Sequence, residues 1–253
     1  MSNQRLPTRV LTFYRSGPMP CPYLDGKAEQ QLFAELTEPA AARQFDILSQ
    51  GGFRRSHQIV YRPACTDCCA CVPVRVVAAD FEPSRSWRRV INANRDLQVT
   101  EVGDQITEEQ YRLFRDYTND RHGDGDMAKM NRREYAAMVV NSPVDTGLVE
   151  FRAPDDRLIA VCLKDRLADG LSAVYSFFAP DEAKRSLGSY VVLWLIGRAH
   201  ELGLDYVYLG YWVPGSRKME YKTRFRPIEA FSTDGWCVLD DEAIGAGSDD
   251  ART

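Results

Sequence analysis

Length, composition and charge describe a globular protein and exclude several classes. With 253 residues, 44% hydrophobic and 27% charged, the chain can bury a core in one large or two modest domains. Its 32 Lys and Arg against 36 Asp and Glu give a net charge of −4, so a nucleic-acid partner would have to be held by a local basic patch. Met1–Arg9 lacks the apolar core of a signal peptide, and the longest apolar run, Val191–Ile196, is too short to span a membrane. We therefore expect a cytoplasmic protein with no membrane partner and with its seven cysteines reduced.

Residues 1–98 are expected to form a smaller N-terminal domain that contains the cysteine cluster. Its predicted elements are helices at Lys27–Leu36 and Ala40–Gln50, strands at Gln58–Tyr61 and Val72–Val77, and a connector at Phe81–Leu97 that runs into a basic helix.

Residues 99–240 show a regular alternation of helices and strands, and residues 241–253 are expected to be a disordered acidic tail. Thr107 with Gln110 and Asn131 with Glu134 form two capping boxes, which predict helices to about Arg121 and to Val140. The further predicted elements are strands at Thr146–Arg152, Leu158–Leu167 and Leu171–Phe178, a helix at Leu187–Leu202, a strand at Tyr206–Trp212, a short basic helix at Ser216–Phe225 and a last strand at Ile228–Phe231.

The junction Lys184–Tyr190 lies between a strand and an apolar helix. A basic loop that enters a helix at a glycine directs free backbone N–H groups and the positive helix end toward an anion. Taken alone, Arg185 followed by Gly188 also suits an ordinary solvated loop. The junction resembles that of the GNAT acyltransferases, where a similar segment binds the pyrophosphate of acetyl-CoA. Because Tyr190 stands where that family has a second small residue, the resemblance implies a looser phosphate site, such as one for the 3′ end of a tRNA.

The segment Tyr206–Pro227 combines basic and aromatic residues, as single-stranded nucleic-acid sites do. A solvated helix face would have the same composition. The motifs within it are more specific, because Leu209–Trp212 and Lys218–Lys222 resemble the LGY and KMxYK signature of the aminoacyl-tRNA–protein transferases of the N-degron pathway. Further segments resemble that family in the same order along the chain: Cys21–Tyr23, Gly52–Ser56, Tyr61–Pro63 and Ser186–Tyr190.

The resemblance implies a GNAT-like α/β (α+β) acyltransferase core that joins an amino acid to the N-terminus of a protein. The forms of the Cys21–Leu24 and Cys71–Arg75 segments look bacterial, which implies leucyl-tRNA as donor, N-terminal Asp or Glu as acceptor and protein-degradation adaptors as further partners. The alternatives are an arginyl-tRNA–protein transferase, a CoA-dependent N-acetyltransferase, and a metal-cluster protein that binds nucleic acid.

The candidate site residues follow from this reaction. A carboxylate on the acceptor calls for arginine or lysine, and proton transfer calls for a titratable group. We assign catalysis to Tyr211, Lys218 and Glu220. We assign substrate binding to Arg54, Arg55, Arg75, Arg185, Gly188, Tyr190, Arg217, Tyr221 and Lys222.

The cysteines leave two possibilities open. Cys65, Cys68, Cys69 and Cys71 have metal-type spacing, and eukaryotic relatives hold an iron–sulfur cluster with two cysteine pairs. Cys21 matches one member of the first pair, but Leu24 replaces its partner, so that ligand set is incomplete. We expect that no cofactor is required, with an iron–sulfur cluster or zinc at these cysteines as the alternative.

Overall fold

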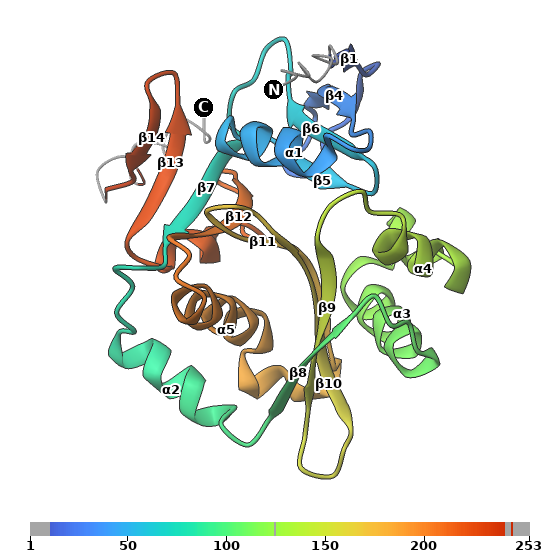
Figure 1. Cartoon of the computed structure of the whole chain (residues 1–253), viewed down its shortest axis with the longest axis vertical. Helices are drawn as coiled ribbons and strands as arrows, with labels where there is room; N and C mark the ends of the chain where they lie inside the picture. Colours follow the sequence, from blue (N-terminus) through green and yellow to red (C-terminus); the bar gives the residue numbers. More distant parts are fainter. Residues whose placement is uncertain (1–10, 124, 241–243, 245–253) are drawn as a thin grey trace, which may run out of the picture.

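A curved sheet of eight strands forms the centre of the chain (Figure 1). The structure is a computed structural model that describes residues 11–123, 125–240 and 244. The strands lie in the order β14-β13-β7-β12-β11-β10-β9-β8, and only β11 and β12 are parallel neighbours. Their bounds are β7 Val72–Val77, β8 Gln98–Gly103, β9 Thr146–Arg152, β10 Leu158–Arg166, β11 Gly170–Phe178, β12 Tyr206–Trp212, β13 Ile228–Ser232 and β14 Gly235–Val238.

Helices cover both faces of this sheet. Helix α5 (Leu187–Glu201) lies in the concave face, and α3 (Glu108–His122) and α4 (Arg132–Val140) lie on the opposite side (Figure 1). Because α5 is apolar over most of its circumference, it buries residues on several sides at once. Helix α2 (Arg85–Ala93) packs beside α5. Both expected capping boxes are present at α3 and α4, and the parallel β11–α5–β12 unit confirms the expected strand–helix–strand core.

The N-terminal part forms a separate small sheet with one helix. Helix α1 (Ala41–Gln50) agrees with the prediction, whereas the helix predicted over Lys27–Leu36 is wrong: its residues form β3 and β4. The four-stranded sheet has the order β1-β4-β6-β5, and β2 pairs with β3. The bounds are β1 Tyr14–Arg15, β2 Met19–Pro20, β3 Ala28–Glu29, β4 Gln31–Glu35, β5 Arg54–Ser56 and β6 Ile59–Pro63.

The domain boundary expected at residue 98 does not separate the two sheets. Strand β7 lies inside the main sheet, between β12 and β13, although it belongs to the N-terminal part of the sequence. The basic helix expected at Ser216–Phe225 is reduced to the 3-10 helix η3 (Glu220–Arg224), and the other 3-10 helices are η1 (Asp126–Lys129) and η2 (Pro180–Arg185). The tail predicted to be disordered lies outside the described residues except for Ile244. Within the described ranges, every helix is too short or too polar to cross a bilayer.

Candidate functional site

Strands β11 and β12 pair only at their beginnings and then diverge. Their parallel register runs from Gly170 opposite Tyr206 to Ser172 opposite Tyr208. Each strand has a bulge just beyond this point, since the register of β11 with β10 shifts around Val174 and that of β12 with β7 shifts around Leu209. Bulges bend strands and increase their twist. The following part of β11 is only partly buried although the strand is central. Beyond Ser172 and Tyr208 the two strands no longer pair, and we call the space between their carboxyl ends the opening.

Arg54 of β5 reaches between these two strands. Its Nη2 atom donates hydrogen bonds of 3.0 Å to the carbonyl oxygens of both Ala173 and Val174 on β11. On the β12 side the guanidinium lies against Gly210, whose φ of +75° and missing Cβ make the close approach possible. Arg54 is half-buried, and among the described residues no carboxylate forms an ion pair with it. The opening therefore contains a positive charge with spare N–H donors.

Lys222 of η3 places a buried amine at the end of β12. The side chain is only 4% exposed, and Nζ donates a 2.6 Å hydrogen bond to the backbone oxygen of Tyr211, the residue that follows Gly210. Within the described part of the chain no carboxylate pairs with Lys222 either. Burial holds its pKa well below the usual value for lysine, and the nearby positive charge of Arg54 lowers it further.

Tyrosines lie near Arg54 and Lys222. The Tyr211 hydroxyl donates to the backbone oxygens of Tyr61, at 2.9 Å, and Gly52, at 3.3 Å, and burial raises its pKa. Since this hydroxyl already donates to two carbonyls, Tyr211 lines the site, and its contacts do not suit the catalytic proton transfer that we predicted for it. Burial, together with the neighbouring Tyr61, raises the pKa of Tyr23 to about 12. We did not select Tyr23 and Tyr61 from the sequence, although both lie in motifs that carry the family resemblance.

The remaining residues of the segment after β12 lie at the surface. Arg217, Lys218 and Glu220 are exposed, and Tyr221 is 38% exposed. The two predicted catalytic residues Lys218 and Glu220 therefore lie outside the buried site formed by Arg54 and Lys222. Their exposure suits contact with a large ligand better than it suits proton transfer at a desolvated centre.

Two arginines predicted to bind substrate, Arg55 and Arg75, are engaged in ion pairs. The buried Arg55 donates to both oxygens of Asp165, at 2.6 and 2.7 Å. Arg75 donates to Glu229 at 2.7 Å, with its guanidinium 3.5 Å from the centre of the Tyr206 ring. These contacts correct the prediction for both residues, because each guanidinium joins elements of the fold and is almost inaccessible.

The junction before α5 also differs from its predicted use. Arg185 donates to both oxygens of Asp96, at 2.8 and 2.9 Å, and to Glu182 at 3.0 Å, so its charge is already balanced. Tyr190 faces the core, with its ring packed edge-on against Phe151. A Cβ on Gly188 would lie 3.3 Å from the Phe178 ring, so close packing of α5 against β11 explains this glycine. A phosphate site that depends on Arg185 is not formed here.

The cysteine cluster is only partly assembled. All seven cysteines are free, and burial with the neighbouring thiols of Cys21, Cys65 and Cys68 raises the pKa of the Cys71 thiol to about 12. Cys69 is exposed, and Cys65 contacts the backbone of Gln30. In the parts of the chain that the structure describes, no three Cys, His, Asp or Glu side chains converge to hold a metal ion.

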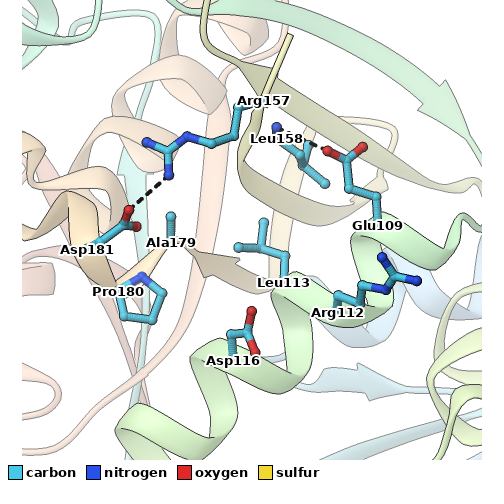
Figure 2. Close-up of a pocket in the computed structure, with 9 residues that line it drawn as sticks. All are labelled: Glu109, Arg112, Leu113, Asp116, Arg157, Leu158, Ala179, Pro180 and Asp181. Atoms are coloured by element: carbon cyan, nitrogen blue, oxygen red, sulfur yellow. Dashed lines mark hydrogen bonds and ion pairs between the residues drawn. The ribbon is translucent and has the colours of Figure 1, made fainter. Parts of the chain in front are cut away.

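A second concave region lies between α3 and the ends of β10 and β11 (Figure 2). It has a volume of about 450 Å³, and most of its charged groups pair with one another or with nearby residues. Arg157 pairs with Asp181 at 2.9 Å and also with Glu182, and Glu109 pairs with Arg152 at 2.8 Å. Among the described residues that line it, only Asp116 lacks an ion-pair partner, and a carboxylate does not bind an anion, so we place the functional site at the opening between β11 and β12.

Comparison with known proteins agrees with the motifs. Residues 109–232 match the family described as arginine-tRNA-protein transferase, C terminus, and residues 19–89 match arginine-tRNA-protein transferase, N terminus. An aspartate/glutamate leucyltransferase of Paramagnetospirillum magneticum is 52% identical over 88% of this chain and 92% of its own length. One of Parvibaculum lavamentivorans is 52% identical over 90% and 95%. Among solved structures, the C-terminal domain of a putative lysylphosphatidylglycerol synthetase from Agrobacterium fabrum is similar with a TM-score of 0.44 and 12% identity, over 60% of this chain and 50% of that one. At this level of identity to curated relatives over nearly their whole length, the chain belongs to the aspartate/glutamate leucyltransferase family.

Proposed function

We propose that this chain transfers leucine from leucyl-tRNA to the free α-amino group of proteins that begin with Asp or Glu. The names of its relatives support this reaction, and the structural observation that carries it is Arg54. A half-buried guanidinium with spare donors and no carboxylate partner among the described residues is a ready site for an anion. The side chain of an N-terminal Asp or Glu supplies that anion, and its α-amine then lies at the opening between β11 and β12.

The reaction needs little chemical activation. The donor is an aminoacyl ester, so a neutral α-amine attacks its carbonyl carbon and the ribose 3′ oxygen leaves. The enzyme contributes chiefly by holding both substrates in a reactive orientation. An α-amino group titrates near pH 8, so roughly a fifth of it is neutral near physiological pH. Neither a covalent enzyme intermediate nor a cofactor is required for this step, and we propose that the cysteine cluster supports the N-terminal fold instead.

The donor tRNA is proposed to bind over the exposed basic segment after β12. Arg217 and Lys218 are exposed there, and Arg224 covers the Trp87 ring at 4.7 Å. Exposed cations beside aromatic rings suit the phosphates and bases of a single-stranded 3′ end. Because charged tRNA is used where translation takes place, we propose a cytoplasmic reaction. Its leucine-bearing product would pass to protein-degradation adaptors of the N-degron pathway.

Purified protein should be tested with separately radiolabelled leucyl- and arginyl-tRNA and with peptides that begin with Asp, Glu, Asn or Lys. Leucine transfer to the Asp and Glu peptides is expected, with little transfer to the Lys peptide. Arginine transfer without leucine transfer would overturn the donor assignment. Equal use of the Lys peptide would overturn the acceptor assignment.

The role of Arg54 is tested by comparing Asp and Asn peptides, which differ in charge and hardly in shape. A charge-assisted hydrogen bond of about 1.5–3 kcal/mol predicts a preference for Asp of roughly 10- to 150-fold in kcat/KM. Arg54→Met should remove this preference. Arg157→Met, in the region of Figure 2, is the matched control and should keep it. If Arg54→Met prefers the Asp peptide over the Asn peptide as strongly as the parent does, another residue binds the acceptor carboxylate.

A further inference from the structure

The attacking amine must lose a proton during the transfer, and the residues discussed so far provide no group beside the opening that accepts it. When the amine nitrogen bonds to the ester carbon, it becomes positively charged and must lose one proton before the product is stable. The ribose 3′ oxygen must gain one proton as it leaves. A single group that takes the first proton and returns it to the second site balances the reaction.

Lys222 is the buried titratable group beside the opening. Its Nζ is held on the Tyr211 carbonyl, one residue after the glycine that contacts Arg54, so the two side chains lie at the same end of β12. The side chain is 4% exposed, and the structure provides it with one hydrogen-bond acceptor and, among the described residues, no carboxylate. A buried ammonium in that setting is costly, whereas a neutral amine is not.

We propose that Lys222 is a catalytic residue that accepts the proton from the attacking amine and returns it to the ribose 3′ oxygen; this rests on the proposed function. In the neutral state one N–H donates to Tyr211, which fixes the direction of the side chain and leaves the nitrogen lone pair free. The lone pair takes a proton from the amine as the C–N bond forms. The resulting ammonium gives it up as the C–O bond breaks, and the neutral lysine is restored.

The groups that act on Lys222 are consistent with this role. Burial and the positive charge of Arg54 both lower its pKa, and Cys71 opposes them by a smaller amount. The Tyr211 hydroxyl stays protonated, because its own pKa is raised by burial. Arg54 thus has a second effect besides binding the acceptor carboxylate: it keeps the neighbouring lysine neutral.

Two other roles for Lys222 make different predictions. Lys222 could serve only to donate a structural hydrogen bond to the Tyr211 carbonyl, or it could bind an anion. In either role another cationic hydrogen-bond donor could replace it. We therefore compare Lys222→Arg, which keeps charge and donors but cannot accept a proton near neutral pH, with Lys222→Met. Both variants should lower the single-turnover rate of peptide leucylation by about 10²- to 10⁴-fold, the usual contribution of a general base, with leucyl-tRNA binding unchanged. Lys129, an exposed lysine on η1, is the matched control, and its Arg and Met variants should act at the parental rate.

Rescue of Lys222→Ala separates the roles directly. Added methylamine can accept a proton and should restore peptide leucylation, whereas guanidinium supplies charge and donors only and should not. Rescue by guanidinium, or near-parental activity of Lys222→Arg, would overturn the proposed role of Lys222. Leucine transfer by the parent protein would still support the proposed function. Absence of transfer by the parent would instead refute the proposed function itself. Should the variants fail to fold in thermal melts, NMR titration of lysine side chains in the parent decides, because a Lys222 that is fully protonated at pH 8 cannot act as the acceptor.

Discussion

Gly210→Ala is the sharpest perturbation of the site. The residue has φ +75°, a conformation that alanine adopts only at a cost. A Cβ built there would lie 2.6 Å from Nε of Arg54 and would overlap the guanidinium further along. The backbone of β12 is fixed by pairing with β7, so Arg54 must leave its position between the two strands.

The expected loss of stability has two parts. The left-handed backbone costs alanine about 1–2 kcal/mol. Displacing Arg54 removes its hydrogen bonds to the carbonyls of Ala173 and Val174, for about 1.5–3 kcal/mol more. In an Arg54→Ala background the second part is already lost, so Gly210→Ala should cost only the backbone part. The difference between the two backgrounds is therefore expected to be about 1.5–3 kcal/mol.

Urea unfolding of the parent, both single variants and the double variant measures this difference. Gly197→Ala in α5 is the control, because a Cβ there meets nothing within 4 Å, and alanine should slightly stabilise the helix. The preference for Asp over Asn peptides should disappear in Gly210→Ala and persist in Gly197→Ala. If Gly210→Ala costs the same free energy with and without Arg54, the guanidinium does not occupy the space between the strands and the site has been misplaced.

Three further predictions test other parts of the argument. Asp165→Asn should destabilise the fold by about 3–5 kcal/mol in urea unfolding, because it leaves the buried Arg55 unpaired, and a loss below about 1 kcal/mol would contradict that role. Because the folded-state pKa of Lys222 is lowered, the unfolded chain binds an extra proton between that pKa and the ordinary value near 10.4, so stability should rise with pH through this window by up to about 1.4 kcal/mol per unit. Lys222→Met should lack this slope, and parallel pH curves for the two proteins would speak against a neutral lysine. Replacing Arg217 and Lys218 by Ala should reduce the salt dependence of leucyl-tRNA binding by about one unit of slope for each lost phosphate contact, and an unchanged slope would place the tRNA elsewhere.

Local signals predicted most of the second half of the chain. The capping boxes at Thr107 and Asn131 and the apolar pattern of α5 act over a few residues, and the structure reproduces them. The segment Gln31–Glu35 shows where such signals fail. Its Gln, Leu, Ala and Glu residues favour a helix, but pairing with β1 and β6 forms a strand that buries Ala34. Tertiary pairing outweighed intrinsic propensity there.

Local sequence signals also fail to predict the site, because two adjacent arginines have different partners in the fold. Arg54 and Arg55 are adjacent on β5, and successive side chains of a strand point to opposite faces. Arg54 therefore enters the opening between β11 and β12, and Arg55 reaches Asp165 on β10. The sequence identifies both as candidate anion binders but contains nothing local that separates them, because the deciding partners lie more than a hundred residues away.

Local pairing also explains how an acidic chain can present a specific site for anions. Its net charge is −4, and many of its arginines are neutralised by carboxylates, as Arg55 is by Asp165 and Arg185 is by Asp96. An arginine that is already paired with a carboxylate offers little binding energy to the carboxylate of a substrate. Arg54 differs because backbone carbonyls, rather than a carboxylate, hold it in place. A carbonyl orients a cation without cancelling its charge. Selectivity for an acidic N-terminus therefore depends on which basic side chain the fold leaves without a carboxylate partner. The number of basic residues in the sequence does not reveal which one that is.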